Sequence, residues 1–112
     1  MITISTIKKD LKDIRYYFSR KELFEKALLD VGANEVLEKI KIYNDVVRSA
    51  SPKLYDIYVS LYLSNLTQEN LSEILGYTSE HISRLNSQLL NFFLKKLTEK
   101  EVKANDKWFS NI

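Results

Sequence analysis

The sequence predicts an all-α fold, a small helical bundle of five or six helices, from three observations. Apolar residues make up 45% of the 112 residues and charged residues 29%, a composition typical of a compact chain rather than a disordered one. Apolar residues recur at helical spacing along almost the whole chain. Only 2 glycines and 1 proline are present, too few for the frequent turns of an all-β fold. We therefore predict a single domain over residues 1–112.

The first half of the chain predicts three helices. Apolar spacings of four, three and four give the first helix an inner face of Ile7, Leu11, Ile14 and Phe18. A capping-box pattern at residues 19–22 begins the second, with an apolar face of Leu23, Phe24, Ala27, Leu28 and Val31. Gly32 then stands where a C-cap glycine is expected. The third helix begins at about Asn34, and its inner face is Val36, Leu37, Ile40, Tyr43, Val46 and Val47.

The second half shows clearer helix boundaries. Ser51 is a suitable N-cap before Pro52, and a break at residues 64–65 ends this helix, whose inner face is Leu54, Ile57, Tyr58, Leu61 and Tyr62. Thr67 caps a short helix that is expected to bury Leu71, Ile74 and Leu75. Gly76 and Tyr77 form a turn, Thr78 caps again, and a last helix runs from about Ser79 to at least Leu97.

Composition excludes several functional classes. With 0 cysteines and 1 histidine, the chain has no disulfide framework, no thiolate nucleophile and none of the usual cysteine or histidine metal centres. No nucleophile–base pair can be assembled, so we predict no enzyme activity, no cofactor and no metal site. The sequence has neither a long apolar run nor a signal-peptide core, so we predict a cytoplasmic protein with no membrane contact. The net charge of +2 does not by itself indicate a nucleic-acid partner.

The functional prediction depends on residues 66–85, which read LTQENLSEILGYTSEHISRL. This pattern predicts a short helix, a turn at a glycine that can take a positive φ, and a capped second helix. Such a pair is a helix-turn-helix, whose second helix presents its first two turns to the DNA major groove. We predict the helix-turn-helix part at residues 54–97, with residues 1–50 as a helical part for bracing or dimerisation.

This stretch resembles the helix-turn-helix of sigma-factor region 4, and more closely the small phage regulators of the ArpU/RinA late-transcription type. The resemblance is carried by Leu66, Thr67, Gln68, Glu69, Leu71, Ile74, Leu75, Gly76, Tyr77, Ile82, Ser83 and Arg84. It implies a DNA-binding transcription regulator of phage or mobile-element type. Double-stranded DNA would be the main partner and RNA polymerase a second candidate partner.

The resemblance also implies which residues contact DNA: Thr67, Gln68, Thr78, Ser79, Glu80, His81, Ser83, Arg84 and Ser87. The chemistry of Arg84 fits this role, because a guanidinium can donate two hydrogen bonds to a guanine edge. Backbone N–H groups that follow Thr67 and Thr78 suit phosphate oxygens. The alternative for Arg84 is an ion pair with Glu80, one turn earlier on the same helix. Lysine-rich groups at residues 8–15 and 95–103 are interpreted as solvated faces, with phosphate contact as the alternative.

The last helix carries two apolar stripes, one formed by Ile82, Leu85, Leu89 and Phe92, the other by Leu90, Phe93, Leu94 and Leu97. A single small domain does not easily cover both, so we predict a homodimer built from the later part of this helix and the N-terminal helices. Two other functions stay open. The acidic residues Glu69, Glu73 and Glu80 favour a protein-binding helix-turn-helix, such as an anti-repressor or an RNA polymerase-binding factor. The second alternative function is that of a small terminase subunit that recognises DNA.

Overall fold

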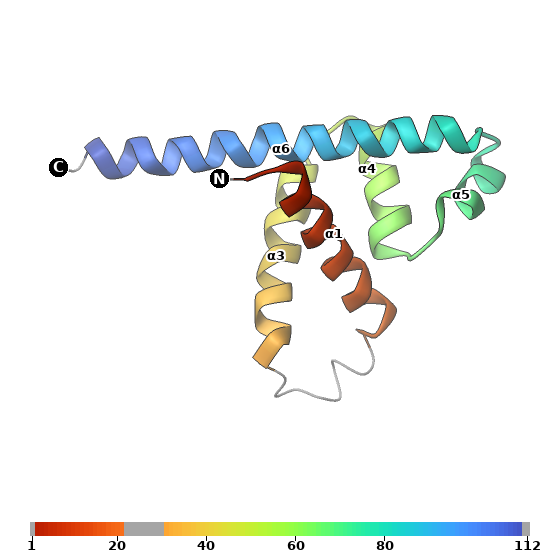
Figure 1. Cartoon of the computed structure of the whole chain (residues 1–112), viewed down its shortest axis with the longest axis horizontal. Helices are drawn as coiled ribbons and strands as arrows, with labels where there is room; N and C mark the ends of the chain where they lie inside the picture. Colours follow the sequence, from red (N-terminus) through yellow and green to blue (C-terminus); the bar gives the residue numbers. More distant parts are fainter. Residues whose placement is uncertain (1, 22–30, 111–112) are drawn as a thin grey trace.

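A computed structural model describes the backbone of residues 2–21 and 31–110, and the side chains of residues 2–21 and 35–101. Over these residues the chain forms helices and turns without a strand, which confirms the all-α prediction. The long helix α6 (Ser79–Ser110) runs along one edge of the molecule, and α1, α3 and α4 lie against one side of it (Figure 1). None of the described helices combines the length and apolarity needed to cross a membrane.

Helices α1 (Ile4–Ser19) and α3 (Val31–Val47) pack side by side through both apolar and polar contacts. The hydroxyl of Tyr43 donates to Asp10 at 2.7 Å, and the ammonium of Lys39 lies 3.3 Å from Asp10 and 3.2 Å from Asp13. These contacts join a buried tyrosine to two carboxylates on the side of α1 that faces α3. The N-cap of α1, Thr3, accepts a hydrogen bond from the N–H of Thr6.

The segment before α3 was predicted to form a second helix that ends at Gly32. Most of the predicted second helix, with Leu23, Phe24, Ala27 and Leu28, lies outside the described residues. Two of its predicted members belong to other helices: Ser19, the expected start of its capping box, is the last residue of α1, and Val31, expected on its apolar face, is the first residue of α3. The expected C-cap role of Gly32 is wrong, because α3 already begins at Val31 and Gly32 lies within its first turn. A glycine near a helix start lowers helix propensity without preventing the helix, and packing of the later turns of α3 outweighs this local cost.

Helix α4 (Pro52–Tyr58) begins as predicted, with the Ser51 side chain accepting from the N–H of Leu54. The helix then widens into a π-helical segment, η1 (Val59–Leu63), which periodicity did not predict. Its end is marked by the N–H of Ser64, which donates to the carbonyl of Val59 at 2.8 Å. Tyr58 at the end of α4 and Leu61 within η1 are both buried in the same core.

The two apolar stripes of α6 are covered by the chain's own helices. Leu89 and Phe93 are fully buried, and the Phe93 ring lies 4.8 Å from that of Tyr43 on α3 and 5.6 Å from that of Tyr58 on α4. The remaining members of both stripes are buried or partly buried: Ile82, Leu85, Leu90, Phe92, Leu94 and Leu97. The premise behind the predicted homodimer is therefore wrong, because the chain's own helices bury or partly bury both stripes, while the homodimer itself stays a prediction. One inner-face assignment also fails, since Leu37 is exposed.

The buried hydroxyls predict a loss of stability at alkaline pH. Burial raises the pKa of the Tyr43 phenol, helped by its hydrogen bond to Asp10, and burial likewise raises the pKa of Tyr58. An unfolded chain ionises its tyrosines near pH ~10, whereas the folded chain keeps these two protonated, so the unfolded state binds fewer protons and stability falls as pH rises above about 10. Urea unfolding at neutral and alkaline pH measures this loss.

The double variant Tyr43→Phe/Tyr58→Phe is expected to flatten the alkaline loss while costing about 1 kcal/mol per lost hydrogen bond at neutral pH. The exposed Tyr77 serves as the control, and Tyr77→Phe should leave the alkaline slope as it is. An equally steep slope in the double variant would contradict the assignment.

Candidate nucleic-acid interface

Helix α5 (Gln68–Leu75) and the start of α6 form the helix pair that the sequence predicted, joined by a turn at Gly76. The Thr67 hydroxyl accepts from the N–H of Asn70 at 3.0 Å, and the Thr78 hydroxyl accepts from the N–H of His81 at 3.1 Å. Gly76 has φ +70°, the left-handed conformation that glycine adopts without steric cost. The predicted caps and the predicted turn are confirmed.

Fewer side chains of α5 are buried against α6 than predicted. Leu71 on α5 is buried in the same cluster as Ile82 and Leu85 on α6. The expected burial of Ile74 and Leu75 is wrong, because their side chains are 66% and 45% exposed. Figure 1 shows α5 at one end of the molecule, where no further described helix covers its last turn. The end of α5 therefore presents an apolar surface to solvent, formed by Ile74, Leu75 and the exposed Tyr77.

The predicted DNA-contacting residues lie at the surface of this helix pair. On α6, Ile82, Leu85 and Leu89 face the core, while the opposite side presents a polar face formed by Glu80, Ser83, Arg84 and Ser87. Thr67, Thr78 and Ser79 are also exposed, and Gln68 and His81 are half-buried. The His81 ring stands edge-on to Tyr77 at 4.7 Å between ring centroids. No helix of the described chain covers the polar face.

Arg84 is the basic residue of this face. Within the described part of the chain no carboxylate forms an ion pair with it, so the alternative pairing with Glu80 is not present. The side chain is exposed at the second turn of α6. A guanidinium in this position keeps all its donors available for an external acceptor.

The same helix pair is acidic overall. Glu69, Glu73 and Glu80 are all exposed, and Arg84 is the one basic side chain between residues 66 and 91. Phosphate contacts supply most of the non-specific affinity of a DNA-binding protein. The helix pair alone therefore lacks the positive charge that a duplex requires, and any such charge has to come from neighbouring elements.

Two polar contacts that the sequence did not reveal hold the helix pair against the rest of the molecule. The Tyr62 hydroxyl on η1 donates to the Asn86 side chain on α6 at 2.5 Å. Asn65, with φ +59°, uses its side-chain amide to donate to the carbonyl of Arg15 at 3.0 Å and to accept from the N–H of Ser19 at 3.2 Å. The loop that leads into α5 is thereby fixed to the C-terminal end of α1. Sequence spacing could not reveal the partners of Tyr62 and Asn65, because each hydrogen bond joins segments that are far apart in the sequence.

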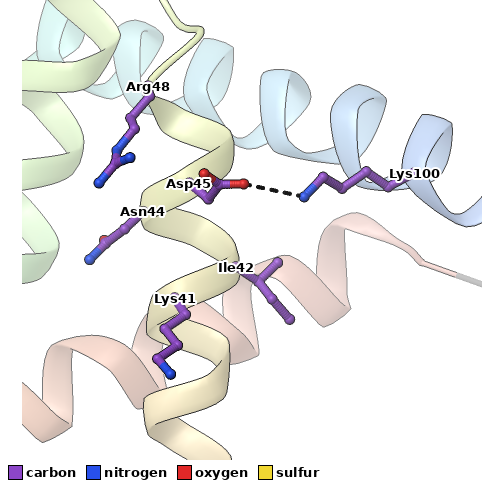
Figure 2. A pocket seen from close by; sticks show the side chains of 6 residues that line it. All are labelled: Lys41, Ile42, Asn44, Asp45, Arg48 and Lys100. Carbon is purple, nitrogen blue, oxygen red and sulfur yellow. Dashed lines mark ion pairs between the residues drawn. The ribbon is translucent and has the colours of Figure 1, made fainter.

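Away from the helix pair, a surface hollow of about 480 Å³ lies between α3 and the C-terminal half of α6 (Figure 2). Its lining residues are Lys41, Ile42, Asn44, Asp45, Arg48 and Lys100. Lys100 lies 3.6 Å from Asp45, and Lys41, Asp45, Arg48 and Lys100 are all exposed. Exposed and partly paired charges do not form a preorganised ligand site, so this hollow is no rival to the surface at the start of α6.

Comparison of the chain with protein-family models, with curated proteins and with solved structures found no match. The function is therefore inferred from the geometry and chemistry of the surface formed by α5 and the start of α6.

The turn at Gly76 yields a stability prediction. The variant Gly76→Ala places a Cβ on a left-handed residue, where an L-residue costs about 1–2 kcal/mol, although no atom lies within contact distance of that Cβ. Urea unfolding should show a loss of this size. Gly76→Asn is the matched control and should lose less, because asparagine tolerates this conformation better. An alanine variant as stable as the unaltered protein would contradict the turn geometry.

Proposed function

We propose that the protein is a DNA-binding transcription regulator that reads duplex DNA with the first turns of α6. The observation that carries this proposal is the exposed polar face of Glu80, Ser83, Arg84 and Ser87 on a helix start that is held rigidly from behind. A rigid helix with short polar side chains and one arginine can enter a major groove and donate to base edges. The core contacts of Ile82, Leu85 and Leu89 supply the rigidity.

The start of α5 supports the same orientation. Thr67 caps the helix through the N–H of Asn70, while the N–H groups of the first helical residues have no partner within the helix. A phosphate oxygen is a suitable acceptor for these groups. On this proposal α5 rests on the DNA backbone while α6 reads the bases, and the phage or mobile-element type follows from the resemblance to ArpU/RinA regulators.

A homodimer stays a prediction, and its ground is now the symmetry of a DNA site rather than the apolar stripes of α6. One helix pair reads only a half-site, and two half-sites related by two-fold symmetry raise both affinity and specificity.

The proposal predicts the behaviour of Arg84→Ala. Loss of a bidentate base contact should weaken binding to the preferred sequence by about 1–3 kcal/mol, and should relax sequence preference at one position. Electrophoretic shift with the DNA that flanks the protein's own gene, at several salt concentrations, measures this. Arg48→Ala removes an exposed arginine from the turn that follows α3 and is the matched control. If the unaltered protein shifts no DNA at low salt, the proposed function is wrong; if Arg84→Ala binds normally, the assigned residue is wrong.

A second candidate function is favoured by the apolar end of α5. Ile74, Leu75 and Tyr77 are exposed together, and the exposed carboxylates of Glu73 and Glu80 stand close to them in sequence. An apolar surface with an acidic rim suits a protein partner that is apolar and basic. RNA polymerase is the candidate partner from the sequence resemblance, and on this alternative the protein binds polymerase rather than DNA.

The double variant Ile74→Ser/Leu75→Ser separates the two candidates. If α5 is a docking surface, the variant should weaken binding to purified bacterial RNA polymerase by tenfold or more, roughly the cost of losing one buried apolar anchor. Its shift of duplex DNA should stay unchanged. Sedimentation of the protein with polymerase provides the measurement, with Ile42→Ser, at an exposed apolar position on α3, as the control. Undiminished polymerase binding by the double variant would remove the alternative.

A further inference from the structure

Helix α1 carries a basic stripe, defined by Lys8, Lys12 and Arg15. Spacings of four and three place these residues on one face of the helix. Lys8 and Lys12 are exposed and Arg15 is half-buried. No carboxylate of the described residues lies within ion-pair distance of any of them. Among the described residues, the stripe therefore presents positive charge that no neighbouring carboxylate neutralises.

The acidic residues of α1 are directed elsewhere. Asp10 accepts from Tyr43 and pairs with Lys39, and Asp13 pairs with the same lysine, so both carboxylates face α3. Hydrogen bonds and charges from the two aspartates outweigh the effect of burial and raise the pKa of Lys39. The fold thus separates the charges of one helix, with acids toward α3 and bases on another side.

The basic stripe adjoins the start of α5. Lys12, Arg15, Tyr16 and Ser19 line a hollow of about 430 Å³ together with Asn65, whose amide is bonded to the backbone of α1. Asn65 is two residues, at most roughly 7 Å of backbone, before Thr67, so the hollow that the stripe lines adjoins the loop leading to the cap of α5.

We infer that the basic stripe of α1 is a second DNA contact, which holds the phosphate backbone beside the segment read by α6. This inference rests on the proposed function and deepens it. The helix pair at residues 66–91 carries three carboxylates against one arginine, so a duplex lying on it needs cations from an adjoining element. The stripe adjoins the start of α5 through Asn65. Lys41, Arg48 and Lys100 instead line the hollow between α3 and the far half of α6 (Figure 2).

The test compares two variants of equal charge change. Lys12→Gln/Arg15→Gln removes two cations from the stripe, and Lys41→Gln/Arg48→Gln, the α3 variant, removes one lysine of α3 and the arginine that directly follows this helix. Binding to a short duplex from the DNA that flanks the gene is measured at several salt concentrations, and ethylation interference maps the phosphates contacted. Two lost phosphate contacts should lower the slope of log K against log salt by about 2 and weaken binding about tenfold per contact at low salt.

The expected result is that the stripe variant loses affinity for all sequences equally and loses interference at phosphates outside the segment affected by Arg84→Ala. The α3 variant should keep the slope and the interference pattern of the unaltered protein. Lys8→Gln/Lys12→Gln, which changes only exposed side chains, repeats the test should Arg15→Gln reduce folding, as judged by circular dichroism.

Three outcomes distinguish the claims. If the unaltered protein binds the duplex and both stripe variants keep its slope and interference pattern, the second contact is refuted while the reading role of α6 stands. An equal loss in the stripe and α3 variants also refutes it, because charge anywhere would then suffice. If the unaltered protein binds no duplex, the proposed function fails, and this inference fails with it.

Discussion

The structure depends on the burial of the two apolar stripes of α6. Phe93 and Leu89 lie at the centre of the core, and Tyr43 and Tyr58 pack on Phe93 from two different helices. Because α1, α3 and α4 lie against one side of α6, the first turns of that helix extend past them toward α5 at the end of the molecule (Figure 1). Burial of the middle of α6 in the core thereby holds the helix in place and leaves the polar face of its first turns exposed.

Charge placement follows from the same packing. Tyr43 needs an acceptor for its hydroxyl once it is buried against Phe93, and Asp10 supplies it. That contact turns the acidic side of α1 toward α3, and the helical repeat then brings Lys8, Lys12 and Arg15 to a different side. The position of the basic stripe on α1 thus follows from the contact of one buried tyrosine, whereas the acidic residues of the helix pair are a separate feature of α5 and α6.

The sequence predicted the features that depend on local chemistry. Ser51, Thr67 and Thr78 cap as expected, and Gly76 takes the left-handed turn, because capping and turn geometry are determined within a few residues. Exposure of Ile74 and Leu75, the position of Gly32 inside α3 and the coverage of both stripes of α6 were missed. Each depends on which helices meet in space, and periodicity gives the apolar face of a helix without telling what covers it. The polar face of α6 was located correctly in sequence, whereas its tie to α1 through Asn65 depends on a contact between distant segments.

The two candidate functions use different parts of one short segment. Reading of DNA requires Arg84 and its neighbours on α6, whereas docking of a protein requires Ile74, Leu75 and Tyr77 at the end of α5. The acidic residues between them oppose a duplex at close range but do not oppose a basic protein. On the proposed function, a duplex on α6 would be attracted mainly by cations outside the pair, so its position would depend on α1, while a protein partner on α5 would be independent of α1. Loss of the basic stripe would then affect the first function and leave the second unchanged.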